Sequence, residues 1–343
     1  METSLSPVDH SLERDYRTVR DFAGRIGLAA GFLKLKGAEA LEFLNRLSTN
    51  DLRGLRERET RATILTTEKG RIIDAVLVVN QGPDLLLIVS QENSQTVKSW
   101  LEKFIIMENI TVEDVTANLK RTSIIGSHAP SIIGHLCPTP SEAVSVQVGP
   151  GVFLYRDPLW TLPVYHLVGT PTAVDSLWNE WAAVHVEIAG ISAVGEGAIE
   201  TLRIESGIPA HGKELTDEVN PLEAGLSRLV SFTKGCYIGQ EVVARVDTYG
   251  KLRRILCGLV FPDVSRNLSV GRLFSSGTEV GWTTSHTYSY QMDKVIALGY
   301  LKGIPATGVI DFKPSDAETM IPLRVVELPF PPADTHAITG HKR

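Results

Sequence analysis

The stretch "TKGCYIGQEVVARVDTYGKLRR" (233–254) combines a cysteine with residues that could activate its thiol. Lys234 stands two positions before Cys236, and a helix that begins near Gly239 would direct its unpaired N–H groups toward the sulfur. A cation and a helix N-terminus both lower the pKa of a thiol and enrich the nucleophilic thiolate. The pattern predicts that Cys236 is a reactive thiol and that Lys234 assists it. The alternative is a small buried cysteine that only packs.

Basic residues follow the cysteine closely enough to form one stripe. They are Arg245, Lys251, Arg253 and Arg254. Such a stripe is most often a solvated face, but it could also clamp a glutamate tail or an anionic partner. On the second interpretation, Arg245 belongs to a cofactor-binding surface.

Asp74 interrupts the apolar run "RIIDAVLVV". Side chains alternate between the two faces of a strand, so Asp74 is expected to share a face with Ile72, Val76 and Val78. A carboxylate among such neighbours is desolvated at a cost unless it meets a partner. Two interpretations stay open: a structural contact, or a carboxylate that lines a ligand pocket and hydrogen-bonds a polar heterocycle.

Two glutamates stand near predicted helix ends. Glu205, in "LRIESG", comes just before a glycine that ends a helix, and Glu223, in "NPLEAGLSRLV", lies in the first turn of a helix after Pro221. A helix dipole favours an anion in its first turn. For Glu223 by itself, a helix N-terminal carboxylate is therefore the simpler explanation.

Several helices are expected around these residues. Apolar residues at helical spacing predict helices over 37–52, 92–106 and 196–207. A further helix is predicted to begin with Thr170 as its cap and Pro171 as its first residue, since proline suits that position.

Strands are expected between and after these helices. The segment 61–79 reads as a hairpin around a Glu-Lys-Gly turn, and 84–90 and 110–126 contain further strands. Residues 127–150, rich in Pro, Ser and Gly, are predicted to be an irregular stretch or a boundary. After about residue 252 the pattern changes to short strands separated by Gly, Ser and Thr turns, which indicates a separate all-β module. The strands predicted there are 252–261, 278–284, 293–301 and 320–328.

The expected architecture is α+β, with several lobes of antiparallel sheets and packed helices. We divide the chain into a core over 1–245 of two interleaved lobes, with a possible subdivision near 127–150. A barrel-like domain over 250–330 and a loose tail over 331–343 follow. A chain of 343 residues suits two or three domains.

Composition excludes several classes of function. The net charge of −6 argues against non-specific binding of nucleic acids. Three cysteines without a C-x-x-C pair favour a reducing cytoplasm and no cysteine-based metal site. We also expect no signal peptide and no membrane span, because no apolar segment is long enough. The sequence contains neither G-x-G-x-x-G nor G-x-x-x-x-G-K-[ST], the two glycine-rich motifs that bind nucleotide phosphates.

The motif "KGCYIGQE" resembles the K-G-C-[FY]-x-G-Q-E motif of the YgfZ family, folate-binding proteins of iron–sulfur protein maintenance. The wider chain, over roughly 17–330, is similar to the glycine-cleavage T-protein (aminomethyltransferase) superfamily to which YgfZ belongs. The segments that carry this likeness are "EKGRIIDAVLVV" and "LRIESGIPAHGKELTDEVNPLEAGL". The resemblance implies a three-lobed fold around a central opening that admits tetrahydrofolate, with the β-module as the C-terminal lobe.

The same resemblance implies roles for individual residues. Asp74, Glu205 and Glu223 match acidic positions at or near the folate pocket, and Cys236 matches the cysteine of the YgfZ motif. Two departures separate the chain from the T-protein. Ala75 stands where the T-protein strand has a second aspartate, and the T-protein lacks the cysteine motif. Both departures weaken an aminomethyltransferase function.

The function expected from the sequence is therefore a cytoplasmic tetrahydrofolate-binding protein that supports assembly or repair of iron–sulfur enzymes. Its partners would be folate and, transiently, iron–sulfur enzymes or assembly proteins, without membrane or specific nucleic acid. Two alternatives stay open. One is a folate-dependent one-carbon transferase of the aminomethyltransferase type, and the other is a non-catalytic scaffold that binds a partner through the basic stripe.

Overall fold

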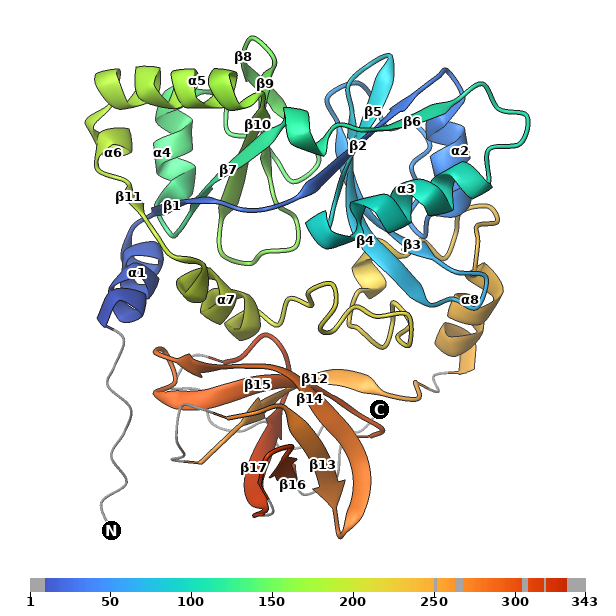
Figure 1. The fold of residues 1–343 in the computed structure, drawn as a ribbon, viewed down its shortest axis with the longest axis vertical. Coiled ribbons are helices and arrows are strands. Elements are labelled where there is room, and N and C mark those ends of the chain that lie inside the picture. Colours follow the sequence, from blue (N-terminus) through green and yellow to red (C-terminus); the bar gives the residue numbers. More distant parts are fainter. Residues whose placement is uncertain (1–9, 250–251, 263–267, 304–307, 318, 332–343) are drawn as a thin grey trace.

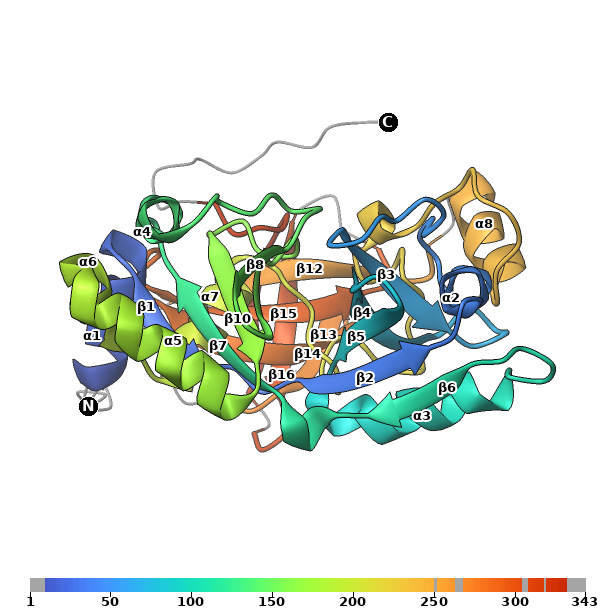
Figure 2. The ribbon, with the colours of Figure 1, turned by 90° about the horizontal axis from the view of Figure 1, so that it is seen from above.

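A computed structural model describes residues 10–249, 252–262, 268–303, 308–317 and 319–331. Within these residues, two sheets with their helices lie side by side, and a β-barrel lies below both of them (Figure 1). Viewed from above, the two sheets occupy opposite ends of the molecule, and barrel strands are visible between them (Figure 2). The Lys251 position and the tail predicted over 331–343, except for residue 331, lie outside the described residues.

The first sheet carries the predicted aspartate. It is antiparallel, with the strand order β3-β4-β5-β2-β6. Its strands are β2 (Gly31–Lys36), β3 (Thr60–Thr66), β4 (Ile72–Asn80), β5 (Asp84–Val89) and β6 (Thr111–Asp114). The predicted hairpin over 61–79 is confirmed as β3 and β4, and the strand predicted at 84–90 as β5.

Two helices cover one face of this sheet. They are α2 (Ala40–Leu47) and α3 (Ser94–Lys103), the latter preceded by the short 3₁₀ turn η1 (Gln91–Asn93). Leu44 of α2 and Val97 of α3 are fully buried in one apolar cluster with strand residues such as Val78. The helices predicted at 37–52 and 92–106 therefore form, although both are shorter than predicted.

The second sheet is built from chain segments that precede and follow the first sheet in the sequence. Its strand order is β11-β1-β7-β10-β9-β8. The strands are β1 (Gly24–Gly27), β7 (Lys120–Ile125), β8 (Val146–Gly149), β9 (Val152–Arg156), β10 (Val164–Gly169) and β11 (Ser192–Ala193). Because β1 precedes the first sheet in the chain and β7–β11 follow it, the two lobes are interleaved.

One expectation about the second lobe is wrong. The stretch 127–150 is not irregular: it contains α4 (Ala129–Leu136) and strand β8. Ile132 and Ile133 of α4 are buried against the sheet, so tertiary packing stabilises a helix that the local composition disguises. The predicted cap at Thr170 is confirmed, because its side chain accepts a hydrogen bond from the Ala173 N–H in α5 (Pro171–Val184), which α6 (Val186–Ala189) follows.

A central segment joins the three lobes. Helix α1 (His10–Asp21) packs against α7 (Glu196–Glu205), and the irregular segment 206–239, with the 3₁₀ turn η3 (Ser227–Leu229), runs from α7 to helix α8 (Gln240–Tyr249). Buried side chains from all three lobes meet in one cluster, among them Phe32, Tyr155, Ile204 and Tyr300. The lobes therefore share a common core.

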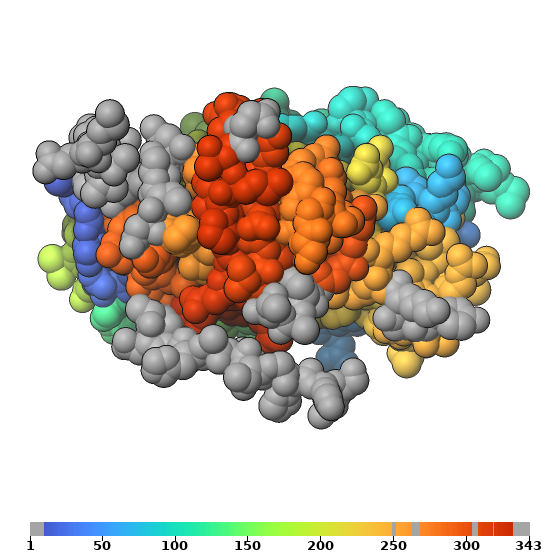
Figure 3. All heavy atoms as spheres, turned by 90° about the horizontal axis from the view of Figure 1, so that it is seen from below, coloured from blue at the N-terminus to red at the C-terminus, as the bar shows by residue number. Residues whose placement is uncertain are grey.

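The C-terminal module is a barrel, as the sequence predicts. In the described part of the chain six strands close in the order β12-β15-β14-β13-β16-β17. They are β12 (Ile255–Val260), β13 (Gly271–Ser275), β14 (Thr278–Ser289), β15 (Lys294–Leu301), β16 (Val309–Pro314) and β17 (Ile321–Val326). Seen from below, barrel residues cover the centre of the molecular surface (Figure 3). Strands β13 and β16 were not predicted.

Candidate functional site

Asp74 lies near the start of β4 and is completely buried. Ser90, just after β5, donates to it twice: the backbone N–H to Oδ2 and the hydroxyl to Oδ1, each at 2.9 Å. Burial raises the pKa of the Asp74 carboxyl, and the Ser90 hydrogen bonds and the nearby His211 oppose that rise. Asp74 is therefore a desolvated carboxyl that is oriented by neutral donors and has no ion-pair partner among the described residues.

Glu205 ends helix α7 and is also buried. The Tyr16 hydroxyl donates to it at 2.8 Å, and the Ser289 hydroxyl of β14 donates at 2.6 Å. Burial raises the pKa of Glu205, while these two hydroxyls lower it. The carboxylate thus ties α1 and the barrel to α7, and its oxygen atoms already have protein partners.

Glu223 does not lie in a helix, contrary to the sequence prediction. Residues 221–225 form an isolated turn, in which the Glu223 carboxylate accepts the Asn220 N–H at 3.0 Å. Two arginines approach the same carboxylate, Arg71 at 3.5 Å and Arg254 at 3.8 Å. Because Arg254 also lies over the Trp282 ring, it is engaged within the protein and is not part of a free basic stripe.

Lys234 is buried and makes hydrogen bonds that the sequence does not suggest. Its ammonium donates to the backbone carbonyls of Asn45, Ser48 and Asn50 at 2.6–2.8 Å. Burial lowers the pKa of Lys234 to about 8, and Asp51 opposes this change. An ammonium has three protons, so these three acceptors occupy them all. Lys234 anchors the cysteine segment to the chain that leaves α2.

Cys236 is exposed, whereas Cys257 is buried and Cys137 is half-buried. Two hydrogen bonds attach the segment that carries Cys236 to the first lobe. The Ile238 N–H donates to the Arg46 carbonyl, and the Thr66 hydroxyl donates to the Ile238 carbonyl. The predicted helix start is confirmed, because α8 begins at Gln240. The thiol is thus presented to solvent on a fixed segment.

Two glycines flank the cysteine segment: Gly235 directly precedes Cys236, and Gly239 directly precedes α8. Gly239 has φ +82°, and a Cβ there would meet the Thr67 carbonyl oxygen at 2.5 Å, so only glycine fits. Gly235 has open space around it. Arg245 is exposed on α8.

The predicted site residues contact different protein partners. Asp74 contacts Ser90, Glu205 contacts Tyr16 and Ser289, Glu223 contacts two arginines, and Lys234 with Cys236 lies beside the end of α2.

One buried polar group was missed by the sequence analysis. His211 lies in the segment after α7, and its Nδ1 is buried without a hydrogen-bond partner among the described residues. The His211 side chain is one of the groups that oppose the burial-driven rise in the pKa of Asp74. The only sequence signal was its position in "PAHGKE", next to Gly212, whose φ is +74°.

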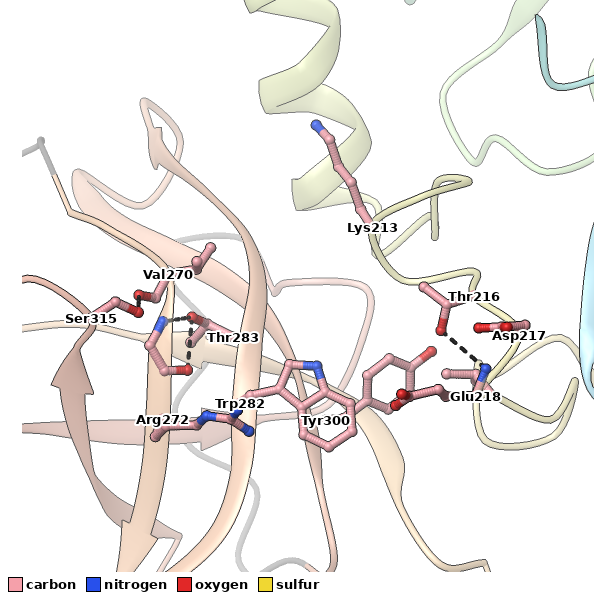
Figure 4. Close-up of a pocket in the computed structure, with 12 residues that line it drawn as sticks. Lys213, Thr216, Asp217, Glu218, Val270, Arg272, Trp282, Thr283, Tyr300 and Ser315 are labelled. Atoms are coloured by element: carbon pink, nitrogen blue, oxygen red, sulfur yellow. Dashed lines mark hydrogen bonds between the residues drawn. The ribbon is translucent and has the colours of Figure 1, made fainter. Parts of the chain in front are cut away.

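A separate cleft of about 490 Å³ lies between the barrel and the segment 213–219 (Figure 4). Trp282 and Tyr300 form its apolar part, and Lys213, Asp217, Glu218 and Arg272 contribute charges. Lys213 pairs with Glu200, and Arg272 pairs with Glu279. Neither Asp74 nor Cys236 lines this cleft, so the cleft and the predicted chemistry do not coincide.

Two kinds of structural feature are absent from the described residues. Within them, no group of three or more His, Cys, Asp or Glu side chains is arranged to hold a metal ion. Within the same ranges, every helix is too short or too polar to cross a bilayer.

Comparisons with known proteins identify the family. The GCVT N-terminal domain matches residues 5–147 and 165–234, and the glycine cleavage T-protein C-terminal barrel domain matches residues 254–331. An aminomethyltransferase of Halalkalibacterium halodurans is 25% identical over 303 residues, covering 85% of this chain and 82% of that protein. A putative chloroplastic transferase of Arabidopsis thaliana is 28% identical, covering 79% and 63%.

A solved structure agrees with the fold. The glycine cleavage system aminomethyltransferase T of Bartonella henselae superposes with a TM-score of 0.78 at 20% identity, covering 93% of this chain and 89% of that one. The expected α+β fold with a C-terminal barrel is therefore confirmed. The two domain models together span most of the sequence, and the chain belongs to the glycine cleavage T-protein family.

Proposed function

We propose that this chain binds tetrahydrofolate or a derivative of it. The observation that carries the proposal is the fully buried Asp74 carboxyl, which accepts two hydrogen bonds from Ser90 and has no ion-pair partner among the described residues. A second buried polar atom, Nδ1 of His211, has no hydrogen-bond partner within those residues. Buried polar groups without partners are rare, and they commonly mark a place where a ligand or water completes the hydrogen bonding. The similarity to aminomethyltransferases makes a folate the appropriate class of ligand.

The polar groups present fit such a ligand. A reduced pterin ring carries several N–H and amino donors, and a carboxylate with free lone pairs accepts from them. When bound, tetrahydrofolate supplies a carrier for a one-carbon unit. Ser90 fixes the Asp74 carboxyl in one orientation, and burial favours its protonated form, so Asp74 can hold or release a proton beside the ligand. Glu205 and Glu223 already have protein partners and serve to position the surrounding segments.

The activity that the comparisons favour is folate-dependent transfer of a one-carbon unit from an amine. Proteins named aminomethyltransferase match over 85% of this chain. The names of these relatives favour this activity over an iron–sulfur role. The free cysteines suit a reducing compartment such as the cytoplasm.

A second candidate function is the maintenance of iron–sulfur enzymes, and one specific observation favours it. Cys236, in the motif "KGCYIGQE", is exposed on a segment that buried hydrogen bonds hold in place. In addition, Ala75 packs against the central apolar cluster, so the chain has no second strand carboxylate at that position. In this function Cys236 would react with a sulfur, a cluster or a partner thiol. A scaffold function has less support, since Arg254 is engaged with Glu223.

Isothermal titration with tetrahydrofolate tests the proposal, and two assays of the Cys236→Ala variant separate the candidates. Turnover of tetrahydrofolate with a methylamine donor that survives Cys236→Ala would support one-carbon transfer. Loss of rescue of iron–sulfur enzyme activity in cells lacking the endogenous factor, with folate binding retained, would support the second function. Cys137→Ala is the matched control, because Cys137 lies outside the motif.

A further inference from the structure

We propose that Ser123, His166 and Asp157 form an acid-sensitive latch, which holds the loop between β9 and β10 in place while the His166 ring is neutral. Protonation of the ring in acid releases this loop, residues 157–163. None of the three side chains takes part in the proposed function, so the inference does not depend on folate binding.

Neighbouring strands of the second sheet bring the three side chains into contact. Ser123 of β7 and His166 of β10 are directly opposite one another, and β9 pairs with the other edge of β10 (Figure 1). The Ser123 hydroxyl lies 2.7 Å from Nδ1 of His166. On the other side of the ring, Nε2 lies 3.1 Å from Oδ2 of Asp157, which directly follows β9.

The burial of these groups excludes a hydrolytic role. Serine, histidine and aspartate also make up the catalytic triad of many hydrolases. Here Ser123 is completely buried and His166 is 1% exposed, so a substrate cannot reach the hydroxyl. The polar chain therefore acts within the protein, on the loop that starts at Asp157.

The hydrogen bonds define which proton each group carries. Burial would raise the pKa of Asp157, but the hydrogen bond from His166 outweighs it and lowers that pKa. The ionised carboxylate can only accept, so Nε2 carries the ring proton and Nδ1 accepts from the Ser123 hydroxyl. A second proton, on Nδ1, would displace the Ser123 proton, for which the structure gives no other acceptor among the described residues. The closed latch therefore requires a neutral ring.

The surroundings of His166 also disfavour a charged ring. Burial lowers the pKa of His166 and the Arg121 guanidinium lowers it further, whereas the hydrogen bond to Asp157 raises it. Arg121 is held by the backbone carbonyls of residues 28–29. From β9, the Tyr155 ring lies 4.9 Å from the imidazole, and burial raises the pKa of Tyr155 to about 12, so it stays neutral. Among the described residues, Asp157 is thus the one anion that faces the ring.

Asp157 connects the ring to a loop that touches the other lobes. Its N–H donates to the Val164 carbonyl, and its Oδ1 accepts the Leu159 N–H at 2.8 Å. The Leu159 carbonyl accepts from Arg228 of η3, and the Leu159 side chain packs against the central apolar cluster. Trp160 packs against the cluster that α1 and α7 share. Since Asp157 contacts the ring, hydration of a protonated ring requires this end of the loop to move.

Titration of the His166 ring by NMR tests its protonation state. The signal is assigned by its loss in His166→Gln. At neutral pH the nitrogen shifts should show the proton on Nε2, and the midpoint should lie below the ordinary value of 6.5. Ser123→Ala removes the hydroxyl that stabilises the neutral ring, so the midpoint should rise. A wild-type midpoint at or above 6.5, or no rise in Ser123→Ala, would overturn the latch.

Hydrogen exchange of the Leu159 amide measures whether the loop opens. At each pH its rate in wild type is divided by its rate in His166→Gln, because glutamine can still donate to Asp157 but does not titrate. The ratio should be constant above about pH 6.5 and should rise by up to about tenfold per pH unit below it, since opening then takes up one proton. His135→Gln, exposed on α4, is the matched control and should exchange as wild type does.

The remaining outcomes also decide the question. A ratio that does not change with pH would show that protonation does not open the loop. An equal rise at the Val78 amide of β4 would mean that the whole protein unfolds, which contradicts a local latch. If His166→Gln does not fold, Ser123→Ala takes its place, and its exchange should rise less in acid than that of wild type. An equal rise in both proteins would overturn the inference.

Discussion

Ser90 donates both its backbone N–H and its hydroxyl to the buried carboxyl of Asp74, each at 2.9 Å. This two-point contact fixes the carboxyl at the turn between β5 and the helix that follows. It provides no compensating positive charge, so the ionised form remains poorly solvated. A carboxyl in this position is unfavourable for stability, which is typical of a residue retained for function.

Asp74→Asn should therefore not destabilise the protein at neutral pH. Asparagine can accept from the Ser90 N–H and donate to its hydroxyl, and it avoids burial of a charge, so we expect a gain of about 0–2 kcal/mol in the free energy of unfolding. Urea unfolding at pH 7 measures it.

The pH dependence of this difference has a definite sign. The folded-state pKa of Asp74 is raised above the ordinary value of 3.8, so wild type loses stability as pH rises from that value through the folded-state pKa. The advantage of the variant should grow over the same interval. A variant clearly less stable than wild type at pH 7 would identify Asp74 as a structural anchor.

Lys234→Met should destabilise the protein by about 2–4 kcal/mol, because it removes three hydrogen bonds and leaves buried carbonyls without a donor. Chemical unfolding measures the change. Lys69→Met is the matched control, since Lys69 is exposed, and should change stability by less than about 0.5 kcal/mol. Equal stability of Lys234→Met and wild type would mean that the ammonium does not anchor the segment.

Cys236 should be the first thiol to react with iodoacetamide at neutral pH. Burial raises the pKa of Cys257 to about 12 and also raises the pKa of Cys137, so both carry little thiolate, whereas Cys236 is exposed. Mass spectrometry of the native protein after timed alkylation gives the order. Finding Cys236 to be the slowest would remove it as a working thiol.

Glu200→Gln should weaken the attachment of α7 in a pH-dependent way. Burial would raise the pKa of Glu200, but Arg203 and Lys213 outweigh it and lower the pKa to about 2. Because the folded-state pKa is below the ordinary value of 4.5, the stabilisation is present above that pH and is lost as pH falls toward 2. We expect a difference of about 1 kcal/mol at pH 7 after screening by solvent, which shrinks at pH 3. A difference that grew on acidification would contradict this assignment.

Local sequence patterns predicted much of the fold. Strand alternation located the β3–β4 hairpin, and the Thr170 cap before Pro171 located the start of α5, because both signals depend on neighbouring residues only. The helix α4 was missed because its stability comes from Ile132 and Ile133 packing against a sheet. The local Pro, Ser and Gly content gave the opposite indication.

The site was harder to predict because its contacts join distant parts of the chain. Lys234 was expected to act on Cys236, but its acceptor on Asn45 lies 189 positions away in the sequence. Similarly, the isolation of His211 Nδ1 depends on what surrounds it in three dimensions. Motifs identify the residue types of a site. They do not show which of those side chains already have hydrogen-bond partners within the protein.

The central claim, that Asp74 belongs to a tetrahydrofolate site, is tested most directly by isothermal titration of tetrahydrofolate into wild type and Asp74→Asn at pH 7. Asp175→Asn, on the outer face of α5 with its side chain 57% exposed, serves as the control. The account predicts measurable binding to wild type and control, and a loss of about 1–3 kcal/mol in Asp74→Asn. Equal affinity of Asp74→Asn and wild type, with the fold intact, would contradict it.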